Sequence, residues 1–217
     1  LRLGNIKKRN ILFFSFELIN NFTNIGLLFT NKLRYISNKY YSSSIINLDN
    51  TLENIRSNFS SKWRNMLVFS EKQNLTLDLG NSKEHFEWIS GIHKKNMSLK
   101  KFKGIDSKTL NQLFKNQDEN NYLCVLRASL NNSYVGAVCI SIHSNSSTYL
   151  IGWTNEKGRH SKSNYYLLWE SIKFLKENKI NFFDLGGIDI EDTFGISSFK
   201  LGLNGEYYSL TPSGFQF

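Results

Sequence analysis

Cysteine and proline are both scarce in this sequence of 217 residues. Its two cysteines, Cys124 and Cys139, lie in alternating apolar runs, which predicts reduced strand residues and neither a disulfide nor a metal-binding pair. This usage favours a cytosolic location. The single proline, Pro212, excludes a proline-rich linker, so composition marks no domain boundary.

Metal-ligand motifs and long uninterrupted apolar runs are also missing. The four histidines show neither HExxH nor HxH spacing, so we predict no metal site. The most hydrophobic segment, residues 11–29, contains Glu17 and three asparagines, which a membrane-spanning helix would bury at large cost. We therefore interpret it as core strands or a core helix. The first residue is leucine and no signal-peptide pattern follows it, so a missing N-terminal part is one interpretation.

What the sequence does contain is enough apolar material for a core and an excess of basic residues. Hydrophobic residues make up 40% of the chain and aromatic residues 14%, which excludes global disorder. The 27 Lys and Arg residues outnumber the 18 Asp and Glu residues and give a formal net charge of +9. This balance favours an anionic partner such as RNA, a phosphorylated small molecule or an anionic membrane surface. The alternative is a lysine-rich soluble surface.

Alternating and helical hydrophobic patterns predict a regular series of elements. Strands are expected at residues 11–16, 25–30, 44–49, 75–80, 121–130, 133–143, 147–154, 180–185 and 206–211. Helices are expected at residues 51–59, 60–74, 82–96, 106–116, 163–179 and 193–200. The expected helix caps are Asp49 or Thr51, Ser82 and Asp106. Residues 31–44 are expected to form an exposed connection.

From Leu75 onward the order of elements is β-α-α-β-β-β-α-β-α-β, which resembles the GNAT acyltransferase fold, an α/β fold with a mixed sheet flanked by helices. Acyl-CoA-dependent members hold the pyrophosphate of coenzyme A on a glycine-rich connection after the fourth strand. Here that connection, residues 154–164, reads TNEKGRHSKSN and has a single glycine, Gly158. Because Arg159 and its neighbours make it basic, it is either a phosphate contact or a solvated loop.

Three blocks carry a more specific resemblance. SSKWRNMLVFSEKQNLTL, SNYYLLWESIKFLKENKINFFDLGGID and GISSFKLGLNGEYY together resemble the Fem-type (FemAB/FemX) aminoacyltransferases, over residues 44–208. The resemblance implies transfer of an aminoacyl group from aminoacyl-tRNA, without a cofactor, to an amine on a peptidoglycan precursor that is lipid-linked or nucleotide-linked. It also implies a cytoplasmic enzyme with peripheral contact to the inner membrane surface.

The same resemblance implies a domain division. Family members resemble two GNAT-like domains in tandem, and the blocks found here belong to the second. Residues 44–217 are then the GNAT-like aminoacyltransferase domain, and residues 1–43 are a remnant of a first GNAT-like domain or an N-terminal extension. In the family, the acceptor site is built largely with that first domain.

The Phe199–Lys200 pair matches the dyad that the family places at the acyl-transfer centre, which implies that both residues are catalytic. An amine attacking an ester forms a tetrahedral intermediate with an oxyanion. The Lys200 ammonium, with a backbone N–H of Phe199 or Lys200, would stabilise that charge, and Phe199 would exclude water. The alternative is a lysine that snorkels to the surface beside a core phenylalanine.

Other residues of these blocks are candidate substrate contacts. Arg64 is interpreted as a phosphate or sheet-edge contact or as ordinary helix surface, and Tyr165 as a channel residue or a core residue. Gly186 and Gly187 are expected to allow positive φ or close approach of a ligand. We expect Asp184 to order their turn by accepting backbone N–H bonds, although a catalytic acid or base is the other interpretation.

Two other functions stay open at this point. One is a GNAT-type N-acyltransferase that uses acyl-CoA on a sugar or polysaccharide precursor, which the order of elements favours and residues 154–164 disfavour. The other is an inactive, truncated domain that only binds a partner.

Overall fold

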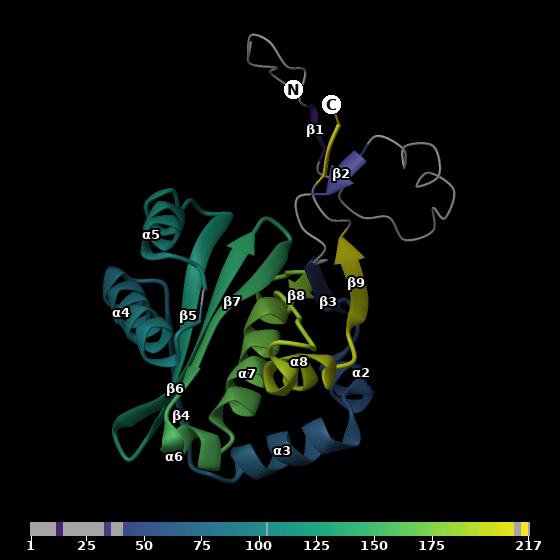
Figure 1. The fold of residues 1–217 in the computed structure, drawn as a ribbon. Helices are drawn as coiled ribbons and strands as arrows, with labels where there is room; N and C mark the ends of the chain where they lie inside the picture. The colour runs from purple at the N-terminus through teal and green to yellow at the C-terminus, as the bar shows by residue number, and fades with distance from the viewer. Residues whose placement is uncertain (1–11, 15–32, 36–40, 103, 211–213, 217) are drawn as a thin grey trace.

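Two β-sheets organise the residues that this computed structural model describes, which are 12–14, 33–35, 41–102, 104–210 and 214–216. The smaller sheet joins β1 (Leu12–Phe14), β10 (Gly214–Gln216) and β2 (Leu33–Tyr35) in antiparallel order β1-β10-β2. The larger sheet has the order β4-β5-β6-β7-β8-β3-β9 (Figure 1). Its strands are β3 (Tyr41–Asn47), β4 (Thr76–Gly80), β5 (Asn121–Leu130), β6 (Ser133–His143), β7 (Ser146–Thr154), β8 (Phe182–Asp184) and β9 (Glu206–Leu210).

Helices fill the connections between these strands. They are α2 (Leu52–Asn58), α3 (Ser61–Glu71), α4 (Lys83–Lys100), α5 (Ser107–Lys115), α6 (Glu156–His160), α7 (Ser163–Glu177) and α8 (Phe194–Leu201). The side chains of Thr51, Ser82 and Asp106 each accept a backbone N–H three residues later, so these predicted caps are confirmed.

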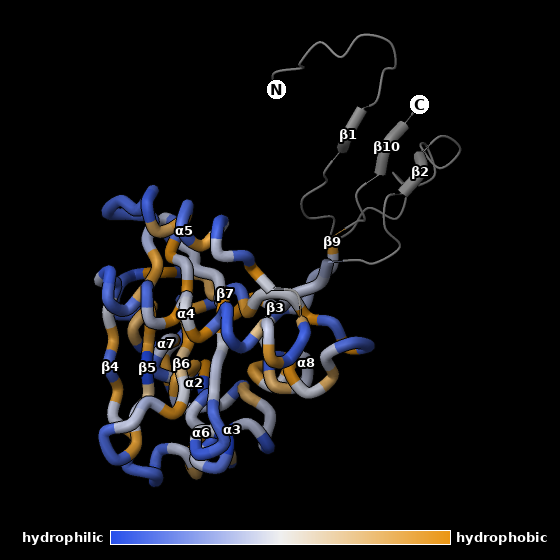
Figure 2. Tube along the Cα trace, turned by 60° about the vertical axis from the view of Figure 1, so that its left-hand side comes forward, coloured by the Kyte–Doolittle hydropathy of each residue, from blue (hydrophilic) through white to orange (hydrophobic). Residues whose placement is uncertain are grey.

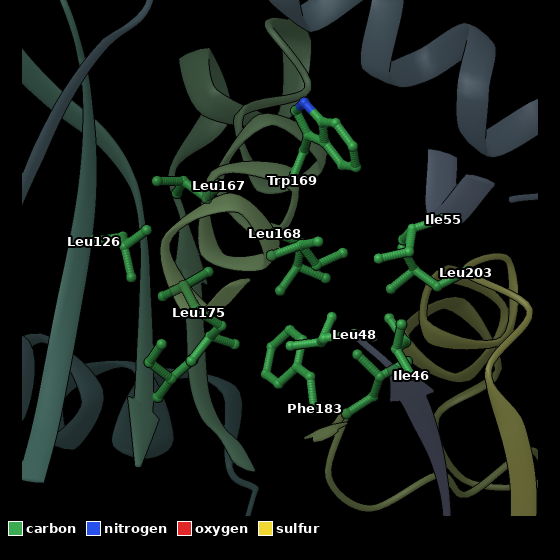
Figure 3. Close-up of a cluster of buried hydrophobic side chains, with 14 of the residues drawn as sticks. Ile46, Leu48, Ile55, Leu126, Leu167, Leu168, Trp169, Leu175, Phe183 and Leu203 are labelled. Atoms are coloured by element: carbon green, nitrogen blue, oxygen red, sulfur yellow. The ribbon is translucent and has the colours of Figure 1, made fainter. Parts of the chain in front are cut away.

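Hydrophobic residues are buried on both faces of the larger sheet. On one face α7 packs against β5, β6 and β8, and Figure 3 shows Leu168 and Leu175 of α7 between Leu126 of β5 and Phe183 of β8. On the other face Phe86 and Ile89 of α4 belong to a second buried cluster. Hydrophilic residues gather in the outer turns (Figure 2). This confirms the predicted mixed sheet with helices on both faces.

The strands β7 and β8 separate after a short parallel pairing. They pair only where Ser146–Thr148 lies beside Phe182–Asp184. Beyond Asp184 the chain follows β3 instead, since the N–H of Leu185 donates to the Ser44 carbonyl. The pairing of β7 with β6 also shifts register between Cys139 and Ile140, which leaves Leu150 without an opposite residue. Bulges of this kind are over-represented beside active sites.

Two predictions about irregular segments were wrong. Residues 31–44, expected as an exposed connection, contain β2 and the start of β3, where Ser42, Ser43 and Ser44 are buried. Their backbones pair with β9, and hydroxyl groups of Ser42 and Ser43 find hydrogen-bond partners, so small polar residues fit the sheet. Residues 154–164, expected as a loop, contain α6, because the Asn155 side chain caps its first turn.

Other expectations concern the N-terminal segment. The strand expected at residues 11–16 is confirmed only for Leu12–Phe14, and the strand expected at 25–30 lies outside the described residues. Apart from residues 12–14, the hydrophobic segment 11–29 also lies outside the described residues. Among the helices that the structure describes, none combines the length and apolar character needed to cross a bilayer.

Candidate acyl-transfer site

Lys200 lies on α8 with its side chain turned into the protein, beside the point where β7 and β8 separate. The residue is only 6% exposed. Its Nζ donates a hydrogen bond to the Gly187 carbonyl at 2.8 Å and lies 5.2 Å from the centroid of the Tyr149 ring. The ammonium therefore does not snorkel to the surface, and the alternative interpretation of Lys200 is wrong.

Burial changes the acidity of Lys200. Desolvation lowers its pKa from the ordinary 10.5 to about 8, although the nearby Asp184 carboxylate acts in the opposite direction. Near neutral pH the side chain is still mostly an ammonium, but it releases its proton far more readily than a surface lysine. A charged donor in such a dry setting is what stabilisation of an oxyanion requires.

The backbone N–H groups that we expected to assist Lys200 are engaged elsewhere. Phe199 and Lys200 lie inside α8, where each N–H donates to the carbonyl four residues earlier. The Phe199 carbonyl accepts from Nε1 of Trp63 at 3.1 Å. The expectation of a backbone donor at the dyad is therefore wrong, and the Lys200 side chain is the donor that α8 presents here.

The two glycines after β8 have different roles. Gly186 has φ +71°, so the expected positive φ is confirmed for it, and a Cβ there would lie 2.5 Å from the Tyr149 carbonyl oxygen. Gly187 is exposed, has no positive φ, and a Cβ there would meet only the Tyr41 ring at 3.5 Å. Its contribution is the carbonyl that holds Lys200.

Asp184 ends β8 and orders this turn, as expected. Its Oδ1 accepts from Ser43 Oγ at 2.5 Å and from the Gly186 N–H at 2.7 Å. Its Oδ2 accepts from the Tyr208 hydroxyl at 2.5 Å. All three contacts are to groups of the protein itself, which favours the ordering role over the catalytic interpretation of Asp184.

Phe199 and Tyr165 meet in an aromatic cluster behind the lysine. The Phe199 ring lies 4.8 Å from Tyr165 and 6.1 Å from Trp63, measured between centroids. Tyr165 is half-buried at the start of α7, and burial raises its pKa. The cluster joins α3, α7 and α8, so Tyr165 packs beside the dyad as well as in the core.

The two arginines predicted as substrate contacts lie outside this cluster. Arg64 donates to the carbonyls of Ser57 and Phe59, so it caps the end of α2, and any phosphate would compete with those bonds. Arg159 is exposed on α6.

The α6 segment uses its own backbone donors. The N–H of Gly158 donates to the Asn155 side chain, and those of Arg159, Ser161 and Lys162 donate to nearby carbonyls. These groups are therefore not available to cradle a pyrophosphate, in keeping with the missing glycine pattern.

Two residues that the structure brings into charged contacts, Tyr149 and Arg127, were not predicted from the sequence. Tyr149 reaches Lys200 only because of the tertiary fold. Arg127, on the far side of the sheet from α7, is 2% exposed and pairs with the exposed carboxylates of Asp78 and Glu84. Within the described residues no group of three or more His, Cys, Asp or Glu side chains could hold a metal ion.

A cavity of about 610 Å³ lies at the other end of β3. Asparagines line much of it, and Glu206 is its single charged residue. Because it has no basic side chain, it does not suit a phosphate group.

The buried lysine gives a testable pH dependence. Between about pH 8 and 10.5 the unfolded chain binds the Lys200 proton and the folded chain does not, so this group makes stability rise with pH. We expect the Lys200→Met variant to exceed the wild type in stability at pH 7 by up to about 3 kcal/mol, at about 1.4 kcal/mol per pKa unit. This advantage should shrink as the pH reaches 10.5. Urea unfolding of both proteins at several pH values measures it, and a constant difference would contradict the burial of an ammonium.

The sequence matches no protein-family model and no curated protein, whereas the fold resembles several solved structures. FemX superposes with a TM-score of 0.69 at 11% identity, over 88% of this chain and 67% of that chain. L-PGS from Bacillus licheniformis gives 0.55 at 15% identity, over 88% and 63%. A tandem GNAT protein from the clavulanic acid biosynthesis pathway gives 0.55 at 9% identity, over 94% and 62%.

The chain thus spans about two thirds of the length of each of these structures. At such identities the likeness concerns the fold alone. The chain therefore has the Fem-type, GNAT-like α/β fold, which is also that of FemX and of the tandem GNAT protein.

Proposed function

We propose that this chain is the GNAT-like domain of an aminoacyltransferase that moves an amino acid from aminoacyl-tRNA to an amine on a cell-wall precursor. The observation that carries the proposal is the buried Lys200 ammonium, held between the Gly187 carbonyl and the Tyr149 ring where β7 and β8 separate. The likeness in fold to FemX supports the same class of reaction.

The proposed chemistry needs one charged donor. The acceptor amine attacks the carbonyl carbon of the aminoacyl ester, and the carbonyl oxygen becomes an oxyanion. The Lys200 ammonium stabilises that charge more than it stabilises the neutral ester. Collapse of the intermediate forms the amide and breaks the ester bond, and the proton that the amine nitrogen loses ends on the leaving tRNA oxygen as a free hydroxyl. Phe199 and Tyr165 shield the lysine from water on the side of α7.

The partners follow from the same proposal. The net charge of +9 suits the tRNA backbone, and the exposed Arg159 is the candidate phosphate contact. Beside the site, Ile190, Phe194 and Ile196 are 51%, 69% and 56% exposed. They are the side chains available for peripheral contact with the inner membrane surface from a cytoplasmic enzyme.

The domain division is part of the proposal. Residues 44–217 would form the aminoacyltransferase domain, and residues 1–43 would belong to a first GNAT-like domain or an extension. Since β3 begins at Tyr41, the strand that supplies Ser43 crosses this boundary. Activity is then best assayed with the longest natural form of the protein.

An acyl-CoA-dependent N-acyltransferase is the second candidate, favoured by the GNAT-like fold. The occupied N–H groups of α6 disfavour it, because coenzyme A needs free donors for its pyrophosphate.

Calorimetric titration separates the two candidates. We expect saturable binding of an aminoacyl-tRNA and no measurable binding of acetyl-CoA. Transfer of a labelled amino acid from tRNA to a peptidoglycan precursor then tests the reaction itself. Micromolar binding of acetyl-CoA without binding of tRNA would overturn the proposal in favour of the second candidate.

Salt dependence adds a matched test of Arg159. Affinity for the tRNA should fall about tenfold or more between low and moderate salt, because neutralised phosphates release counterions. Arg159→Gln should reduce the slope by about one, as expected for one lost phosphate contact. Arg56→Gln should leave it unchanged, since Arg56 is already paired with Glu71 at 2.7 Å. An equal effect of both substitutions would mean that Arg159 has no specific role.

A further inference from the structure

Lys200 has few charged neighbours, although several elements pack around it. Tyr149 of β7 lies under its ammonium, and Asp184 of β8 lies across the glycine turn. Tyr208 of β9 and Tyr41 of β3 surround Asp184. Burial raises the pKa of all three tyrosines above their ordinary range, so they are neutral near pH 8.

A second acid near this turn makes hydrogen bonds within its own segment. Asp189 lies on the segment before α8, and its carboxylate accepts from the backbone N–H groups of Glu191 and Asp192. It therefore orders its own loop. Of the acids placed around the turn, Asp184 is the one whose charge acts on Lys200.

Short contacts join Asp184 to Lys200 through the two glycines. The Gly186 N–H donates to Asp184, and the next residue, Gly187, accepts from Lys200 Nζ. A Cβ at Gly186 would lie only 3.7 Å from that Nζ. On its other side Asp184 is fixed by the hydroxyl groups of Ser43 and Tyr208, which come from two further strands.

Resting on the proposed function, we infer that Asp184 is the positioning residue of the transfer centre, anchored by Ser43 and Tyr208 so that Lys200 stays charged and in place. Asp184 touches no reacting atom in this role. It supplies the fixed negative charge that offsets the desolvation of the ammonium, and it holds the turn whose carbonyl orients Nζ. Without the charge, the buried lysine would lose its proton at a lower pH.

Replacing Asp184 with asparagine tests the effect of its charge while its shape is kept. In Asp184→Asn the carboxamide oxygen can still accept from Ser43 and the Gly186 N–H, so the turn is kept while the charge is lost. Asp184→Glu keeps the charge on a side chain one methylene longer. Glu206→Gln is the matched control, because it removes an exposed acid from a neighbouring strand, β9.

The experiment is a direct NMR titration of Lys200 in the whole chain labelled with ¹³C-lysine, with the resonance assigned by its absence in Lys200→Met. We expect the pKa of Lys200 to fall by about one unit or more in Asp184→Asn. It should stay near the wild-type value in Asp184→Glu and Glu206→Gln.

An unchanged Lys200 titration in Asp184→Asn would overturn the inference, as would an equal fall in Glu206→Gln. If Asp184→Asn does not fold, Ser43→Ala takes its place, because it removes one anchor of the Asp184 carboxylate and keeps the charge. A fall in the pKa of Lys200 in Ser43→Ala would support the inference, and a wild-type value would overturn it. No substrate is needed, so a failure of aminoacyl transfer would count against the proposed function and leave this result standing.

Discussion

Replacing Lys200 with methionine should reduce the rate of transfer by about a hundredfold or more, in the range found when one oxyanion donor is removed. Methionine keeps most of the apolar stem and removes the ammonium. At pH 7 the variant should be as stable as the wild type or more stable, because a desolvated charge has been removed from a residue that is only 6% exposed. Single-turnover transfer and thermal unfolding, measured on the same samples, test both parts.

A lower transfer rate together with unchanged or higher stability would identify Lys200 as catalytic. A structural lysine would give normal turnover, and a residue needed for folding would give a lower melting temperature. Donor affinity should change little, since the charge acts mainly on the transition state. Lys62→Met is a control, because Lys62 is exposed on α3. Near wild-type turnover in Lys200→Met would refute the catalytic assignment.

Gly186→Ala should lower the free energy of unfolding by roughly 2 to 4 kcal/mol, the sum of a left-handed backbone and an overpacked contact. The new Cβ would lie 2.5 Å from the Tyr149 carbonyl oxygen at a residue with φ +71°. Relief of that contact moves the turn away from β7 and the Gly187 carbonyl away from Lys200. Chemical denaturation measures the loss of stability, and the transfer assay should show a parallel loss of rate.

The adjacent glycine provides the comparison. Gly187→Ala places its Cβ 3.5 Å from the Tyr41 ring, an ordinary contact, and needs no positive φ. We expect a change in stability within about 0.5 kcal/mol for this exposed position. Equal destabilisation by both substitutions would show that the turn tolerates no side chain at all, and that Gly186 is not special.

Strong periodic patterns made most of the fold predictable. The strands β5 and β6 have the predicted bounds, Asn121–Leu130 and Ser133–His143. Their long apolar runs are buried on both sides, so local sequence and tertiary packing agree. Sequence reasoning failed at Ser42 and Ser43, whose hydroxyl groups find partners more than 140 residues away. It also failed at α6, since a helix of five residues is too short to show a period.

The candidate site was predictable only in part. The Phe199–Lys200 pair was found through the family resemblance, and nothing in the local sequence shows that the lysine is buried. Tyr149 and Asp184 act on it from two different strands, β7 and β8, an arrangement that no spacing in the chain encodes. The sequence also treats Gly186 and Gly187 alike, although their backbone angles differ.

The place of β3 between β8 and β9 has a consequence for how the protein folds during synthesis. Tyr41 pairs with Leu210, so the two strands of this ladder are far apart in the sequence and are made at different times. Ser43 and Tyr208 both donate to Asp184, so this hydrogen-bond network beside Lys200 cannot be complete until Asp184 and Tyr208 have left the ribosome. Such non-local pairing makes folding slow. The helices and the β5–β6 hairpin can form from local contacts, whereas the surroundings of Lys200 are complete only when β9 pairs with β3.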